Sequence, residues 1–281
     1  MTDSQQFIQQ IDVHEVKPDV FESMAHTENF RKTLYGGQVI AQALMSAMRT
    51  VEDRDVHSVH AYFLRAGTNA EPVSYEVERI RDGRSISSRR VVAKQHGKVI
   101  FYLSSSFHID EDGYAHQEST PTGIPSPEEL LKKKEATTDI PETANKDNVS
   151  SPFLILPIPE NFFVSTNIHE PEAYFWIKTS EPLAKEKHQQ TAALAFASDL
   201  GLLATALLPH PSSLFERSLF AASIDHAMWF HSNTIDLNDW ILCHTQSPWA
   251  GKARGYARAS LFTRQGELIA STAQEGLIRP T

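Results

Sequence analysis

The sequence predicts an α+β protein made of two similar units, each with one apolar helix and an antiparallel sheet. Two strongly apolar runs of helical character, residues 37–48 and residues 192–208, each precede segments in which apolar and polar residues alternate as in strands. A length of 281 residues with 41% hydrophobic residues suffices for a substantial core in two units of ordinary size. We therefore expect one unit duplicated within a single chain.

The strands that follow the two helical runs are related in sequence. SVHAYF at residues 58–63 corresponds to IDHAMWF at residues 224–230, and a long alternating hairpin follows in each half. The first hairpin is expected to turn at residues 96–97 and the second at residues 265–266, each of which contains a glycine. Both halves therefore follow one plan of helix, strand and hairpin.

A helix that is apolar nearly all round must be covered on every side, and a curved antiparallel sheet wrapped around it provides that cover. This arrangement is a hotdog. Two such units can pair edge to edge into one continuous sheet, which removes an exposed edge from each. The expected fold is therefore a double hotdog, and the alternative is two unrelated α+β domains that resemble each other by chance.

The two predicted units are separated by a segment of different composition. Prolines and charge clusters gather there, aromatic residues are few, and such a composition buries too little apolar surface to offset chain entropy. Only residues 125–135 have the pattern of a short surface helix. We expect an N-terminal hotdog over residues 1–108, a Pro-rich polar linker over residues 109–160 and a C-terminal hotdog over residues 161–281.

Charge and composition exclude several classes of partner. A net charge of −9 argues against a nucleic-acid or anionic-membrane surface, which requires clustered positive charge. The apolar run at residues 192–208 contains Asp199 and Gly201 and is a poor membrane span. A single cysteine, Cys243, and a start without a secretory pattern predict a protein of the reducing cytoplasm. Ligand clusters are absent from the sequence, so we expect neither a metal nor a cofactor.

Asp199 attracts attention because a carboxylate is costly in an apolar run. A buried carboxylate is expected only where it is paired or used in chemistry. The alternative is a helix N-cap, for which aspartate is a favoured residue. The apolar residues that precede Asp199 weaken the second interpretation.

Neither Ser223 nor Cys243 has the surroundings of a covalent nucleophile. Alternation along the strand places Ser223 and His226 on opposite faces, which excludes a local Ser-His pair. Cys243 and His244 are adjacent in a strand and point apart, so a packed thiol is expected. Gln274, near the end of the last strand, either orients a water through its amide or faces solvent.

Four strings of the sequence closely resemble the acyl-CoA thioesterase II family: LYGGQVIAQAL at 34–44, SIDHAMWFH at 223–231, SPWAG at 247–251 and ASTAQEG at 270–276. The likeness extends from about residue 30 to residue 279 and weakens only in the linker. It implies a double hotdog, hydrolysis of medium- to long-chain fatty acyl-CoA, and a site made of Asp199, Ser223 and Gln274. It also implies association into a homodimer or homotetramer and a role in fatty-acid metabolism.

The chemistry expected of these residues is attack by an activated water. Asp199 is expected to act as general base or to orient the water, with Ser223 and Gln274 adding hydrogen bonds to it. Backbone N–H groups of Gly37 and Gln38, from the other unit, are the candidates for an oxyanion hole. A hotdog hydratase or dehydratase and a non-catalytic acyl-CoA sensor are the alternatives. The phosphates of CoA either meet a basic face or leave it as a solvated sheet face, and this face comprises Arg84, Arg89, Arg90, Lys252, Arg254 and Arg258.

Overall fold

The computed structural model describes residues 3–26, 33–136 and 151–281. The strands are β1 (Val13–Lys17), β2 (Val20–Ser23), β3 (Asp55–Phe63), β4 (Ser74–Asp82), β5 (Ile86–Gln95), β6 (Lys98–His108), β7 (Phe153–Ile158), β8 (Glu172–Thr179), β9 (Leu219–Ser223), β10 (Asp225–Phe230), β11 (Ile241–Gly251), β12 (Arg254–Thr263) and β13 (Leu268–Pro280). The helices are α1 (Asp3–Ile11), α2 (Gly36–Met48), α3 (Pro127–Ala136), α4 (Lys187–Ala197) and α5 (Leu202–Leu207).

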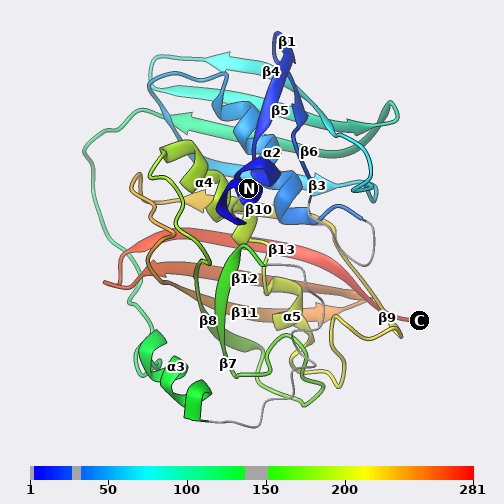
Figure 1. Cartoon of the computed structure of the whole chain (residues 1–281), viewed down its shortest axis with the longest axis vertical. Helices are drawn as coiled ribbons and strands as arrows, with labels where there is room; N and C mark the ends of the chain where they lie inside the picture. Colours follow the sequence, from blue (N-terminus) through cyan, green and yellow to red (C-terminus); the bar gives the residue numbers. More distant parts are fainter. Residues whose placement is uncertain (1–2, 27–32, 137–150) are drawn as a thin grey trace.

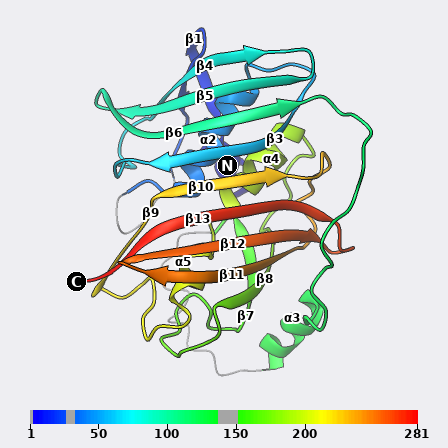
Figure 2. The ribbon, with the colours of Figure 1, turned by 180° about the vertical axis from the view of Figure 1, so that it is seen from behind.

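All these strands belong to one sheet, which runs the length of the molecule (Figures 1 and 2). Its order is β1-β2-β4-β5-β6-β3-β10-β13-β12-β11-β8-β7, with β9 paired to β13. The two halves meet where β3 pairs antiparallel with β10, and Ala227 lies opposite His60. The edge-to-edge pairing expected of a double hotdog is therefore confirmed, and the seam removes one open edge from each half.

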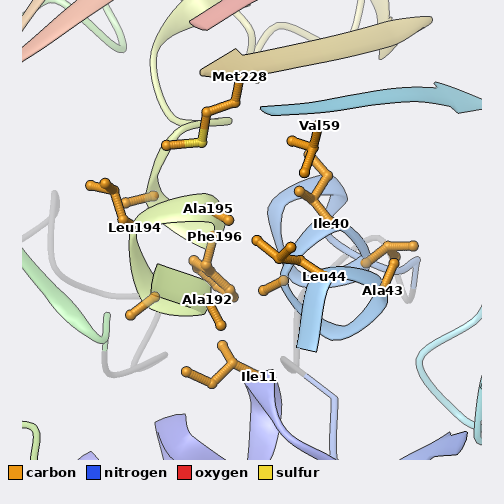
Figure 3. Close-up of a cluster of buried hydrophobic side chains, with 14 of the residues drawn as sticks. Ile11, Ile40, Ala43, Leu44, Val59, Ala192, Leu194, Ala195, Phe196 and Met228 are labelled. Carbon is orange, nitrogen blue, oxygen red and sulfur yellow. The ribbon is translucent and has the colours of Figure 1, made fainter. Parts of the chain in front are cut away.

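The central helices α2 and α4 lie side by side on one face of the sheet (Figure 3). Every residue of α2 from Gly37 to Met48 is buried, as predicted for a helix that is apolar nearly all round. Ile40 and Leu44 of α2 face Ala192 and Phe196 of α4. In the same view Val59 and Met228 come down from the two seam strands, so the core is continuous across the halves.

The two long hairpins turn where the sequence predicts. His96 and Gly97, between β5 and β6, have φ angles of 49° and 71°, as a type I′ turn requires. Between β12 and β13, Gly266 has a φ angle of 89°, and its N–H donates to the carbonyl of Thr263 at 3.0 Å. Both hairpins therefore use glycine for a left-handed position.

The second apolar run differs from the prediction, because it forms two helices instead of one. Helix α4 ends at Ala197, and α5 begins after Gly201, whose φ angle is 83°. Helix α5 then packs closely on the sheet, since a Cβ at Gly276 would lie 2.4 Å from Leu203. Asp199 consequently lies in the turn between two helices and not within a helix.

The segment between the halves is also more structured than its composition suggested. Helix α3 forms as expected, but β7, at residues 153–158, belongs to the second half of the sheet and not to a linker. Upstream of α3, the indole of Trp176 donates to the carbonyl of Pro125 at 2.8 Å. Ile124 and Leu130 pack on a separate apolar cluster around Trp176 and Phe262, on the face of the sheet away from the central helices.

One helical stretch, Lys187–Leu207, is long and apolar enough to cross a membrane by composition. In the structure 83% of its apolar window is buried, and the stretch is interrupted at Gly201. Both features are those of a core helix in a folded domain.

Candidate active site

Asp199 joins the two halves of the molecule. It follows Ser198, the C-cap of α4, and its Oδ2 accepts a hydrogen bond of 2.9 Å from the backbone N–H of Gly37 in the first turn of α2. The N-cap residue of α2, Tyr35, makes no side-chain cap of its own. A carboxylate from the second half therefore occupies the end of α2 where unpaired N–H groups and the helix dipole favour negative charge.

The adjacent glycines of α2 allow this close approach. A Cβ on Gly36 would lie 2.7 Å from Oδ2 of Asp199, and one on Gly37 would lie 2.2 Å from the carbonyl oxygen of Phe196. A Cβ at Gly37 would meet fixed backbone, so only glycine fits there, whereas a Cβ at Gly36 would displace the Asp199 carboxylate. The ring of Phe63, from β3, closes the other side of Gly36.

Ser223 and Gln274 lie together next to Asp199. The amide Nε2 of Gln274 donates to the Ser223 hydroxyl at 2.9 Å, and both side chains lower the pKa of the Asp199 carboxyl. Gln274 is 2% exposed, so the solvent-facing alternative is wrong for this residue. The structure thus brings the three predicted residues into one cluster from the α4–α5 turn, the end of β9 and the middle of β13.

The strand that carries Ser223 departs from the predicted alternation. Ser223 lies opposite Gly276 of β13 and Ala227 lies opposite Ala273, so four steps on one strand match three on the other. Such a bulge changes which side chains share a face. Ser223 and His226 are therefore both beside Gln274, although no hydrogen bond links them directly.

Burial sets the protonation of Asp199. Desolvation is the largest effect and raises the pKa of the carboxyl to about 7, and hydrogen bonding by Gln274, Gly37 and Ser223 offsets part of it. Oδ1, the second oxygen, is buried and has no hydrogen-bond partner among the described residues. The group is therefore a carboxyl that gains and loses a proton near neutral pH, with one oxygen available to bind a further donor.

Sequence reasoning missed His226 as part of this cluster. Its Nδ1 lies 2.6 Å from Oε1 of Gln274, and its Nε2 lies 2.9 Å from the hydroxyl of Ser198 and 3.1 Å from that of Thr272. The only local signal was its place beside Met228 and Phe230 in a buried alternation. A contact to a residue 48 positions away leaves no trace in such a pattern.

One of the two oxyanion candidates has another partner in the structure. The N–H of Gly37 donates to Asp199, so it positions the carboxylate and is not directed at a substrate carbonyl. The side chain of Gln38 donates to the carbonyls of Gln10 and Ala25, which holds the N-terminal segment against α2. The expectation for Gly37 is therefore corrected, whereas the backbone N–H of Gln38 stays a candidate.

Other groups weighed from the sequence lie outside the cluster. Cys243 is buried in the core, and burial raises the pKa of its thiol far above the usual range. Arg89 is 2% exposed and donates to Thr50 and Asp82, so it cannot belong to a phosphate-binding face. Within the described residues, no group of three or more His, Cys, Asp or Glu side chains could hold a metal ion.

Comparisons with known proteins agree with this architecture. A model of the acyl-CoA thioesterase family matches residues 161–277, and one of the acyl-CoA thioesterase N-terminal domain matches residues 26–108. Acyl-CoA thioesterase 2 of Haemophilus influenzae is 39% identical over 92% of both chains. Human acyl-coenzyme A thioesterase 8 is 37% identical over 88% of this chain and 81% of its own.

The fold is similar to solved structures over its whole length. An acyl-CoA thioesterase II from Mycobacterium marinum superposes with a TM-score of 0.78 at 34% identity, covering 98% of each chain. Sequence, fold and full-length coverage therefore agree, and the chain belongs to the acyl-CoA thioesterase II family and is a hydrolase of acyl-CoA thioesters.

Proposed function

We propose that the protein hydrolyses medium- to long-chain fatty acyl-CoA by direct attack of a water molecule that Asp199 activates. The observation that carries the proposal is the Asp199 carboxyl itself. It is held by Gly37, it has a buried oxygen without a partner among the described residues, and its pKa is about 7. A general base whose pKa lies near the working pH is the most effective one.

In this mechanism the water donates one hydrogen bond to Oδ1 of Asp199. As its oxygen attacks the thioester carbonyl carbon, its proton passes to Asp199. The tetrahedral intermediate then collapses, the C–S bond breaks, and CoA leaves as a thiolate that takes the proton from Asp199, which returns the carboxylate to its ionised form. A thiolate leaves readily, so one buried carboxyl suffices for the proton transfers.

Ser223 and Gln274 supply orientation. Because the Gln274 amide donates to the Ser223 oxygen, the Ser223 hydroxyl proton is directed elsewhere, toward Asp199 or the water. Two donors beside one carboxylate restrict where a water can bind. We assign both residues to positioning the nucleophile, and neither to forming a covalent bond.

The surroundings of the site suit an apolar acyl group. Phe63 lies against Gly36, and Leu200, next to Asp199, packs on the main core. This supports fatty acyl substrates over polar ones. We also propose that the protein acts in fatty-acid metabolism in the cytoplasm, as a homodimer or homotetramer whose mass light scattering would measure.

The direct test is replacement of Asp199 by Asn. The variant keeps an acceptor for the Gly37 N–H but lacks a base, so kcat should fall by about a hundred- to ten-thousand-fold with palmitoyl-CoA. KM should change little. Release of free thiol measures turnover, and it also distinguishes a hydrolase from a hydratase or a non-catalytic sensor. Folded Asp199→Asn protein with near wild-type turnover would move the base elsewhere.

Intact-mass spectrometry during turnover separates water attack from covalent catalysis. No adduct of acyl mass is expected on the wild-type enzyme. Cys243→Ser is the matched control, because its thiol is buried and lies outside the cluster, and this variant should turn over normally. A trapped acyl adduct on Ser223 would overturn the water mechanism.

A further inference from the structure

A buried histidine links two of the three elements that carry the proposed site. His226, in β10, is 1% exposed and contacts Gln274 in β13 through Nδ1. Through Nε2 it contacts Ser198, the residue directly before Asp199 at the end of α4. One imidazole therefore spans the sheet strand that holds the amide and the helix end that holds the carboxyl.

Burial keeps the His226 ring neutral, and the two hydroxyls beside its Nε2 also reach backbone carbonyls, Ser198 that of Ala195 and Thr272 that of Ala227. Burial lowers the pKa of His226 to about 4, and a neutral imidazole has one donor and one acceptor nitrogen. Within the described part of the chain, its hydrogen-bond partners are one amide and two hydroxyls, and none is a carboxylate. Which nitrogen carries the proton is then tied to which way the Gln274 amide points.

The carboxylate of Asp199 decides between the two orientations. If Nδ1 carries the proton, it donates to Oε1 of Gln274, and the amide NH₂ faces Ser223 and Asp199. If Nε2 carries it, the amide turns over and its oxygen faces a carboxylate, which is electrostatically unfavourable.

We propose that His226 is a positioning residue for hydrolysis: its Nδ1–H holds the Gln274 amide with the NH₂ group toward Asp199 and Ser223, and the hydroxyl of Ser198 or Thr272 turns to donate to the opposite nitrogen. The inference rests on the proposed function of Asp199 and Gln274. It replaces the expectation from strand alternation that His226 lies on the face of the strand away from Ser223.

A pair of variants separates the two ring nitrogens. Asn places an N–H near the position of Nδ1, whereas Leu fills the space without a donor. His226→Leu should lower kcat about ten- to a hundredfold and change KM little. This loss corresponds to leaving the buried Gln274 amide oxygen without its hydrogen-bond donor. His226→Asn should restore turnover to within about fivefold of wild type. His60→Leu, an exposed histidine on the neighbouring strand, is the matched control and should be normal.

A double variant distinguishes positioning from a purely structural role. If His226 acts through Gln274, adding His226→Leu to Gln274→Ala should cost little further activity. The same loss in both backgrounds would overturn the inference. So would wild-type turnover in folded His226→Leu.

Nitrogen NMR of the wild-type protein supplies a readout without turnover. We expect the His226 ring to carry its proton on Nδ1, and a ring protonated on Nε2, or on both nitrogens, would overturn the inference even if His226→Leu fails to fold. Retained turnover in Asp199→Asn would instead contradict the proposed function and leave the NMR result standing.

Discussion

Asp199 is subject to two opposing influences at the scale of a single residue. Burial of the carboxylate raises its pKa, whereas the N–H of Gly37, the amide of Gln274 and the hydroxyl of Ser223 lower it. Burial prevails, and the pKa settles at about 7. The residue is thereby a base that is ionised in a large fraction of molecules at neutral pH and still attracts a proton.

This pKa predicts the pH dependence of turnover. If ionised Asp199 is the base, kcat should rise about tenfold per pH unit below 7 and level off above it. His226 titrates near 4 and adds no step in that range. Steady-state rates between pH 5 and 9 measure the profile, and a half-maximal point below pH 5 would contradict the assignment.

The same shift predicts how stability depends on pH. Because the folded-state pKa is raised above 3.8, the stability that Asp199 contributes is complete below about pH 4 and is lost as pH rises through 7. Asp199→Asn removes this loss. At pH 8 the free energy of unfolding of this variant, measured with denaturant, should exceed that of wild type by about 1 to 4 kcal/mol. At pH 4 the two proteins should differ little.

At the scale of elements, the contact between α2 and α4 depends on one glycine. A Cβ at Gly37 would lie 2.2 Å from the Phe196 carbonyl and 2.6 Å from the ring of Tyr35. Neither the backbone of α4 nor the packed ring can give way without moving the helices apart. The spacing of the two helices and the position of Asp199 are therefore set together.

Gly37→Ala should consequently lower both stability and turnover. We expect a loss of about 1 to 3 kcal/mol in the free energy of unfolding, the usual cost of overpacking, and a lower kcat because Asp199 is displaced. Gly113→Ala is the control, since a Cβ there has nothing within 4 Å. Urea unfolding and thiol release measure the two effects. A Gly37→Ala protein as stable and active as the control would show that the helices can separate freely.

At the scale of the whole molecule, the site needs both halves. Asp199, Ser223 and Gln274 all come from the second half, but the N–H that holds Asp199 and the ring of Phe63 come from the first. The seam between β3 and β10 and the shared core between α2 and α4 fix the halves against each other. The second half therefore carries the three proposed catalytic residues but lacks the groups of the first half that hold Asp199 in place.

Expression of the chain as two pieces tests this dependence. Residues 111–281 alone should turn over at least about a hundredfold more slowly than the intact chain, because the carboxyl is no longer held in place. Co-expression with residues 1–110 should yield a complex that copurifies and regains activity. Full activity in the second piece alone would show that the first half is dispensable.

The sequence by itself determined the kinds of elements, their duplication and the family. Helix α2 and the hairpins follow from apolar patterns that repeat every two to four residues, and such patterns depend only on neighbours along the chain. The pairing of the two units follows from the duplication of these patterns. The resemblance named Asp199, Ser223 and Gln274, and the structure brings them together, while their catalytic roles stay a proposal.

Only the tertiary structure decided how these residues meet. Packing between distant segments decides the left-handed Gly201 before α5, the bulge after Ser223, and the links from Gly37 to Asp199 and from His226 to Gln274. Local periodicity predicts which face a side chain occupies within one element. It carries no information about which group on another element, 48 or 162 residues away, will satisfy a buried donor or acceptor.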